Sequence, residues 1–134
     1  MKMTALALAA LLPASLSAAT IGEELSRLVI NPINGTDFEV IETQTMGAAE
    51  FWCAAASFNE VRQGRSGLID LYVKRPRGPS ITQPGRKGVI FTTDPSGLPQ
   101  SAGSLTLTVS QPGASLRSVQ ARRYCRDAFT RSTK

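Results

Sequence analysis

The stretch Gly47–Arg62 reads GAAEFWCAAASFNEVR, and it decides the fold of this chain. Its alanine-rich composition favours a helix. Glu50 lies in the first turn, where the helix dipole stabilises a carboxylate, and Gly64 follows as a C-terminal cap. Apolar side chains recur near helical spacing and form one wide face: Phe51, Trp52, Ala55, Ala56, Phe58 and Val61. We expect so apolar a helix to pack against a sheet.

The segments on either side of this helix predict that sheet. The connections Arg75–Gly88 and Asp94–Ser104 are rich in proline, glycine and serine, and are predicted to be long loops. Before the first strand, Gly22–Ile30 is expected to form a short helical stretch that Asn31 and Pro32 end. The strand candidates alternate apolar and polar residues, as half-buried strands do: Asp37–Thr43, Leu68–Lys74, Val89–Thr93 and Leu105–Val109.

The last predicted element is a second helix, from Ser118 as its N-cap to Phe129. Leu116–Ala121 alone could also continue as a strand. Helical spacing relates the residues of its expected inner face: Ala121, Tyr124, Cys125 and Ala128. Together these elements predict a single small α+β domain over residues 20–134, with about four or five mainly antiparallel strands and two helices on one face of the sheet.

Residues 1–19 have the pattern of a secretory signal peptide, with a cationic start and the apolar run Ala5–Leu12. The small-residue rule places the cleavage site after Ser17 or Ala19. The alternative is an uncleaved anchor, since Met3–Ile21 carries no charge, although Pro13 weakens a continuous apolar helix. No later segment is long and apolar enough to span a membrane. The mature protein is therefore expected to be periplasmic or secreted, without a transmembrane segment.

Export makes a disulfide the expected state of the only two cysteines, Cys53 and Cys125. The bond would tie the last helix to the central one and stabilise the fold by about 4 kcal/mol. The alternative, a reactive thiol at Cys53, lacks support because thiol activation needs a basic or cationic neighbour. Trp52 and Ala54 flank Cys53, and the chain has no histidine and no Cys-x-x-Cys motif.

The absence of histidine excludes several chemistries. Ser-His-Asp triads, Cys-His dyads and histidine zinc sites are impossible, and no metal site or cofactor is predicted. A pair of carboxylates could still hydrolyse glycosides. The acidic residues considered for that role are in no recognisable motif: Glu50, Glu60, Asp70 and Asp94. We therefore expect a protein that is not an enzyme, with a carboxylate-based hydrolase as an alternative.

The chain carries a net charge of +5, and its basic residues form two clusters. The first lies at the two ends of the predicted loop 75–88, and contains Lys74, Arg75, Arg77, Arg86 and Lys87. Arginine forks suit phosphates and carboxylates, so this loop could bind an anionic envelope polymer, a lipid head group or an acidic protein. It could instead only protect a sheet edge from aggregation. The second cluster is C-terminal: Arg117, Arg122, Arg123, Arg126 and Arg131.

A nucleic-acid site is not expected. Gly85-Arg86-Lys87-Gly88 matches the glycine clamp of one RNA-binding fold, but that clamp joins two helices, whereas this segment leads into a strand. An exported protein also has little access to RNA. We take the match to be coincidental.

Several short motifs together resemble small uncharacterised exported proteins of alphaproteobacteria. They are Asn31-Pro32, Phe38-Glu39-Val40, Phe51-Trp52-Cys53, Tyr72-Val73, Arg77-Gly78-Pro79-Ser80 and Tyr124-Cys125. The resemblance implies a periplasmic or extracellular destination. It brings no known activity, ligand or catalytic residue.

The function expected from the sequence is a non-enzymatic binding module of unknown ligand, which contacts an anionic partner through its basic loop. The first alternative is a small periplasmic enzyme inhibitor, in which Ser80–Pro84 would be the inserting element. The second alternative is the carboxylate-based hydrolase.

Overall fold

The computed structural model describes residues 28–43, 46–100 and 107–128. The predicted leader at 1–19, most of the predicted helical stretch 22–30, the first residues of the predicted strand at 105–109, and Arg131 lie outside this part of the chain.

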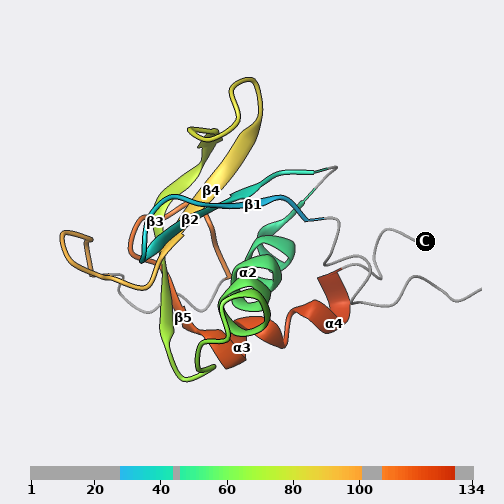
Figure 1. Ribbon diagram of the computed structural model, residues 1–134, viewed down its shortest axis with the longest axis vertical. Coiled ribbons are helices and arrows are strands. Elements are labelled where there is room, and N and C mark those ends of the chain that lie inside the picture. Colours follow the sequence, from blue (N-terminus) through green and yellow to red (C-terminus); the bar gives the residue numbers. More distant parts are fainter. Residues whose placement is uncertain (1–27, 44–45, 101–106, 129–134) are drawn as a thin grey trace, which may run out of the picture.

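The described chain forms one antiparallel sheet of five strands, ordered β1-β2-β4-β3-β5. Its helices all cover the same face of that sheet (Figure 1). The strands are β1 (Ile30–Pro32), β2 (Asp37–Ile41), β3 (Asp70–Pro79), β4 (Lys87–Thr92) and β5 (Ser115–Arg117). The helices are α2 (Ala48–Ser57), η1 (Phe58–Arg62, a π-helical turn), α3 (Ser118–Arg122) and α4 (Cys125–Ala128). The predicted α+β class is confirmed.

The core lies between the sheet and α2. Phe38 packs against Phe58 with ring centroids 4.6 Å apart, and Trp52 meets Phe91 edge-on at 5.0 Å. The Trp52 indole N–H donates to the Thr108 carbonyl oxygen at 2.9 Å, so the one polar atom of this buried ring is satisfied. These aromatic contacts hold the central helix on the sheet face that the sequence predicted it would cover.

The central helix begins and ends nearly as predicted. The Gly47 N–H donates to the Glu50 carboxylate at 3.0 Å, and Gly64 has a φ of 62°, which favours glycine after a helix. The expectation that Val61 belongs to the buried face is wrong, because this side chain is 63% exposed. The last turn is wider than an α-helical turn, with Gln63 N–H donating to Phe58 O. This extra width carries Val61 around to the solvent side.

The segment 75–88 is not the long loop that its prolines predicted. Strand β3 continues to Pro79 and β4 begins at Lys87, so only residues 80–86 connect them. The pairing register shifts twice along β3, once between Val73 and Arg75 and again before Gly78. Such bulges leave a residue unpaired and bend the strand, which lets it include prolines that cannot donate to a ladder.

Two other predictions of secondary structure are also wrong, one of a helical stretch and one of a strand. Ile30 begins β1 instead of ending a helical turn, and it pairs with Val40 of β2. The described part of the predicted strand 105–109 is not a strand, and the fifth strand is β5. The turn before β5 depends on Gly113, which has a φ of 83° and donates its N–H to Val73 O at 2.7 Å.

The predicted C-terminal helix is present as two short helices, α3 and α4, separated by Arg123 and Tyr124. Ser118 is the first residue of α3 and not its N-cap. Its hydroxyl donates to the Glu60 carboxylate at 2.7 Å, so it joins α3 to η1. Of the predicted inner face, Ala121, Cys125 and Ala128 are buried, whereas Tyr124 is only half-buried.

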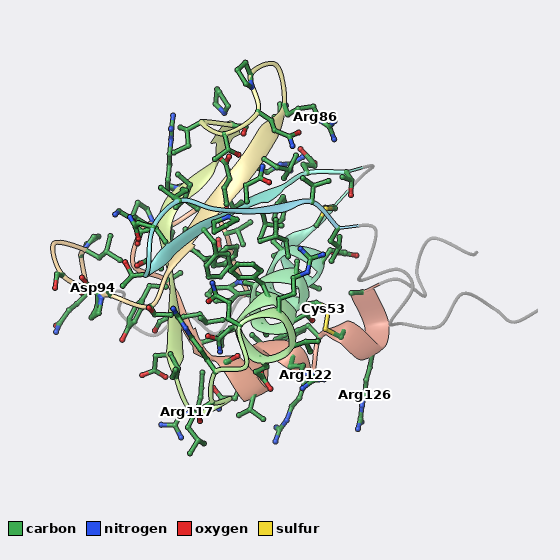
Figure 2. The ribbon with its side chains drawn as sticks, viewed as in Figure 1. Cys53, Arg86, Asp94, Arg117, Arg122 and Arg126 are labelled. Carbon is green, nitrogen blue, oxygen red and sulfur yellow. A yellow bond between two sulfur atoms is a disulfide. The ribbon has the colours of Figure 1, made fainter. Side chains whose placement is uncertain are left out.

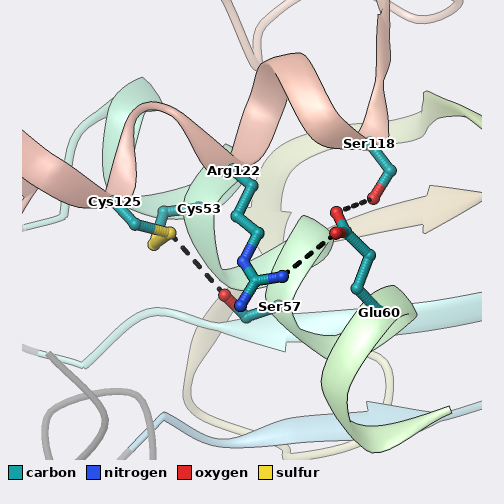
Figure 3. The surroundings of a disulfide bond; sticks show 6 residues. All are labelled: Cys53, Ser57, Glu60, Ser118, Arg122 and Cys125. Carbon is teal, nitrogen blue, oxygen red and sulfur yellow. Dashed lines mark hydrogen bonds and ion pairs between the residues drawn. A yellow bond between two sulfur atoms is a disulfide. The ribbon is translucent and has the colours of Figure 1, made fainter. Parts of the chain in front are cut away.

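The predicted disulfide is confirmed. Cys53 of α2 and Cys125 of α4 form a bond with an S–S distance of 2.01 Å and a Cα–Cα distance of 4.9 Å. Figure 3 shows the bond between the two helices, with the Ser57 hydroxyl 3.6 Å from the Cys125 sulfur. Both cysteines are buried, so the bond fastens α4 directly to the core helix.

Candidate functional site

The most specialised local structure is the connection between β3 and β4, which we call the hairpin tip (residues 80–86). Glu39 of β2 holds this tip, although its side chain is almost fully buried, with 1% exposed. One carboxylate oxygen accepts from the Ser80 hydroxyl at 2.6 Å, the Thr82 N–H at 3.0 Å and the Thr82 hydroxyl at 2.5 Å. The other accepts from the Ile81 N–H at 3.1 Å. A single carboxylate therefore fixes three consecutive residues of the tip.

Glu39 remains ionised at neutral pH in this position. Burial acts to raise its pKa, but the hydrogen bonds from Ser80, Ile81 and Thr82 outweigh burial and lower the pKa from its ordinary 4.5. Among the described residues, every hydrogen bond to the Glu39 carboxylate comes from a hydroxyl or a backbone N–H, and none comes from a cationic side chain.

Gly88 makes room for this buried carboxylate. A Cβ at position 88 would lie 2.9 Å from Val40 O and 3.1 Å from the Glu39 Cγ. Any side chain there would push β2 and the Glu39 side chain away from β4. No local pattern indicates this close approach, because a glycine in a proline-rich and glycine-rich stretch predicts a loop.

Further bonds stiffen the tip. Its ends are joined by the Ser80 N–H donating to Arg86 O at 2.8 Å, and the Asn31 amide of β1 donates to the Thr82 hydroxyl at 2.9 Å. The Ser80 hydroxyl also accepts from the Gln83 N–H at 2.9 Å. Despite these anchors, the Ile81 side chain is 50% exposed. The tip thus presents an apolar side chain on an ordered backbone.

The five cations predicted to flank a loop lie on this hairpin, but the structure neutralises some of them. Lys74 pairs with the buried Asp37 at 2.5 Å, and Arg77 pairs with Glu42. The Arg86 guanidinium donates to the Glu42 backbone carbonyl at 3.2 Å. Arg75 and Lys87 are exposed and form no ion pair with any described carboxylate. Arg75, Arg86 and Lys87 are therefore the cations available to a partner.

The Lys74–Asp37 pair predicts a loss of stability in acid. Burial acts to raise the pKa of Asp37, but hydrogen bonds from Lys74, Thr92, Asn34 and Thr36 outweigh it and lower the pKa to about 2. Because the folded-state pKa is below the ordinary 3.8, this stabilisation is complete above about pH 4 and is lost as pH falls toward 2.

We expect the free energy of unfolding to decrease by about 2 kcal/mol from this group across that window. Urea unfolding at a series of pH values measures the decrease. The variant Asp37→Asn should have a lower free energy of unfolding at neutral pH, and this free energy should decrease less steeply as the pH falls. An equally steep decline in the variant would contradict the assignment to Asp37.

The second basic cluster lies at the other end of the molecule. We call Arg117, Arg122, Arg123 and Arg126 the arginine row. Figure 2 shows Arg117, Arg122 and Arg126 along the lower end, below the helices, while Arg86 lies at the upper end on the hairpin. The two basic clusters are therefore separate surfaces.

The four carboxylates considered for hydrolysis lie on different elements, and each has its own intramolecular partner. Glu50 accepts from the Gly47 N–H, and Glu60 accepts from the Ser118 hydroxyl and pairs with Arg122 at 3.1 Å (Figure 3). Asp70 lies 3.8 Å from Arg117. Asp94 accepts from the Ser96 N–H at 3.0 Å. Each of the four therefore has a local contact of its own, and no two of them share a partner.

In the described part of the chain, these carboxylates belong to no possible metal cluster and line no part of a hollow beside β3. Within the described ranges, no group of three or more histidine, cysteine, aspartate or glutamate residues could hold a metal ion. An open hollow of about 560 Å³ lies beside β3, and none of the four carboxylates lines it. Its lining residues are Tyr72, Pro95, Ser96, Leu98, Pro99, Gln100, Gly113 and Ser115.

Sequence reasoning found the cations of the hairpin but missed the residues that order it. Glu39 looks like any solvent-facing glutamate of an alternating strand, and Ser80 and Thr82 look like ordinary loop residues. Only their meeting in the fold reveals their role.

No family model, curated protein or solved structure matches this chain. Among the described residues, no helix has the length and hydropathy needed to cross a bilayer. Function must therefore be inferred from the geometry of the chain itself.

Proposed function

We propose that this protein is an exported, non-enzymatic binding module that recognises an acidic protein surface with its β3–β4 hairpin. The observation that carries the proposal is the burial of Glu39 beneath the hairpin tip. A buried carboxylate that accepts four hydrogen bonds from three consecutive residues orders the tip before any partner arrives. Ordering in advance lowers the entropy that binding would otherwise cost.

The side chains around the tip suit a protein partner. Ile81 offers an exposed apolar contact on the tip, Arg86 ends the tip and Lys87 begins β4, while Arg75 lies farther along β3, opposite Ile90. An apolar contact surrounded by charges is the usual arrangement of a protein interface, whereas an anionic polymer needs charge alone. Asp37, Glu39 and Glu42 offset much of the hairpin's positive charge, which also favours specific recognition over general attraction to polyanions.

Export is supported by the leader pattern at 1–19 and by the disulfide, which oxidising compartments favour. The non-enzymatic part of the proposal is supported by the lack of histidine and by the separate structural contacts of the four candidate carboxylates.

The test is a pull-down from envelope extract with the immobilised, oxidised protein at low and high salt. The triple variant Arg75→Gln, Arg86→Gln, Lys87→Gln and the single variant Ile81→Asp should each retain at least about tenfold less of the captured protein. High salt should weaken capture by the wild type, because charges of opposite sign contribute to it.

The matched control removes the same number of charges from the arginine row, as Arg117→Gln, Arg123→Gln, Arg126→Gln. This control should capture the partner as the wild type does. Equal capture by the hairpin variants would refute the proposal, as would capture that depends only on charge and not on Ile81. Retention on heparin with no captured protein would assign the hairpin to an anionic polymer instead.

A second candidate function, enzyme inhibition, is favoured by the same ordered tip. Inhibitors that insert a loop need a rigid, exposed segment, and Ser80–Pro84 is fixed at Ser80, Ile81 and Thr82 while Ile81 remains exposed. A panel of proteases and muramidases measures this activity. Inhibition that Ile81→Asp relieves would support this function, and no inhibition at micromolar concentrations would exclude it for the enzymes tested.

A further inference from the structure

The end of the molecule opposite the hairpin has a surface that the proposed function does not use. On α3 and α4, the side chains of Ser118, Ala121, Cys125 and Ala128 are buried against α2 and its neighbours. Five of the residues between them are exposed. They include Val119 and three members of the arginine row, Arg122, Arg123 and Arg126. Figure 2 shows Arg117, Arg122 and Arg126 extending away from the ribbon at this end.

The charge of the arginine row is available to a partner. Arg122 pairs with Glu60 at 3.1 Å, but the arginine side chain is 50% exposed while the carboxylate is only 12% exposed. Arg117 lies 3.8 Å from Asp70, with both side chains about half exposed, a distance and exposure at which an ion pair contributes little. Arg123 and Arg126 are exposed and form no ion pair with those carboxylates whose side chains the structure describes, a set that does not include Asp127.

Apolar side chains accompany the arginines. Leu68 is 71% exposed and Val119 is 41% exposed. The Val119 N–H donates to the Gly67 carbonyl at 2.8 Å, which places the start of α3 beside the turn that carries Leu68. These two are among the five large hydrophobic residues exposed in the described part of the chain. This end is therefore both cationic and apolar.

We propose that this end docks on an anionic lipid bilayer, with the arginine row on lipid phosphates and Leu68 inserted beside them. The chemistry of the two components matches: arginine binds phosphates through its fork of donors, and exposed aliphatic side chains enter the interfacial region. The turn around Leu68 lies at the lower extreme of the ribbon (Figure 1), so a flat surface can reach it. A protein partner is less suited, because protein hot spots favour aromatic anchors, and the exposed large hydrophobics of the described residues are all aliphatic.

The inference is independent of the proposed function of the hairpin. Docking through the arginine row leaves the hairpin tip at the far end of the long axis, directed away from the bilayer (Figure 1). A membrane-bound protein could then still present Ile81 and its neighbouring cations to a soluble partner.

Cosedimentation of the oxidised protein with vesicles tests the proposal. The protein is purified after export, and its intact mass identifies its N-terminus. The probes are vesicles of phosphatidylcholine with and without one-third phosphatidylglycerol. Each arginine near an anionic bilayer contributes about a fivefold gain in binding. The variant Arg117→Gln, Arg123→Gln, Arg126→Gln should therefore lower the partition coefficient about a hundredfold at an ionic strength of about 0.1 M. Arg122 is left intact because it bonds Glu60.

The matched control is the hairpin variant Arg75→Gln, Arg86→Gln, Lys87→Gln, which has the same net charge as the row variant. Its binding should change by less than about threefold, because charges far from the bilayer are screened beyond about 10 Å. Leu68→Gln should weaken binding even in high salt, since its contribution is apolar. Circular dichroism and thermal unfolding check that the variants remain folded.

Unchanged binding of the row variant to anionic vesicles would overturn the proposal, as would an equal loss in the hairpin variant. Equal binding of the wild type to neutral vesicles, or no binding to anionic ones, would also overturn it. The comparison between variants cancels any contribution of residues 1–19, because all variants share them. A protein captured from extract through the arginine row, without vesicle binding, would assign this surface to a protein instead.

Discussion

The double variant Cys53→Ala, Cys125→Ala is expected to unfold with a free energy about 4 kcal/mol below that of the oxidised wild type. The bond joins residues separated by 72 positions, so its removal frees a long loop in the unfolded chain. Domains of this size are stable by only about 5–15 kcal/mol, so the bond supplies a large share of the total stability. Among the variants considered, we expect this one to have the largest effect. Urea unfolding of the two proteins measures the difference.

The loss should be greatest at the C-terminal end of the fold. Helix α4 has only four residues, and its contacts are mainly with α2, where the disulfide is located. We expect the amides of α4 to exchange faster in the variant, while those of β2 and β4 keep most of their protection.

Reduction of the wild type provides the control. Protein unfolded and refolded with a reductant should have the stability of the double variant, and the double variant should be insensitive to the reductant. Equal stability of the oxidised and reduced wild type, with two free thiols found by mass spectrometry, would show that the bond does not stabilise the fold.

Glu39→Gln is expected to lower the free energy of unfolding by about 2–4 kcal/mol and to release the hairpin tip. The glutamine amide has the same shape as the carboxylate, but one of its two oxygens becomes an NH₂ group that donates. That NH₂ would point at donors of Ser80, Ile81 or Thr82, where every contact now needs an acceptor. The buried polar groups would be left unsatisfied, and the tip would no longer be ordered.

Two measurements separate this effect from a general loss of stability. The amides of Ile81 and Thr82 should exchange faster in Glu39→Gln, and capture of a partner by the hairpin should fall at a temperature where the variant is still folded. Glu42→Gln serves as the control, because it removes only the partner of the half-exposed Arg77. That change should cost less than about 1 kcal/mol. Unaltered exchange at Ile81 in Glu39→Gln would show that this carboxylate does not order the tip.

The pairing of strands shows where sequence reasoning failed. The prolines at 76 and 79 and the glycines around them indicated a loop, because their local preferences oppose a central strand. In the fold, two register shifts absorb the prolines and β3 pairs with β4 along its length. The cations expected to border a loop are therefore on a hairpin, where Asp37 and Glu42 neutralise two of them.

The sequence by itself determined what depends on neighbouring residues or on composition. The central helix follows from the spacing of its apolar side chains, and its ends follow from Glu50 and Gly64. The α+β class follows from the mixture of patterns, and the disulfide follows from a single cysteine pair.

Only the tertiary structure decided what the hairpin can do. Glu39 meets Ser80 and Thr82 across 41 and 43 residues, and Gly88 is needed because β2 passes so close to it. The same is true of the second surface, where the turn at Leu68 lies beside α3 and the arginines far along the chain. The physical reason is that the burial of a charge and the satisfaction of its hydrogen bonds are properties of groups brought together by folding, and no local pattern records them.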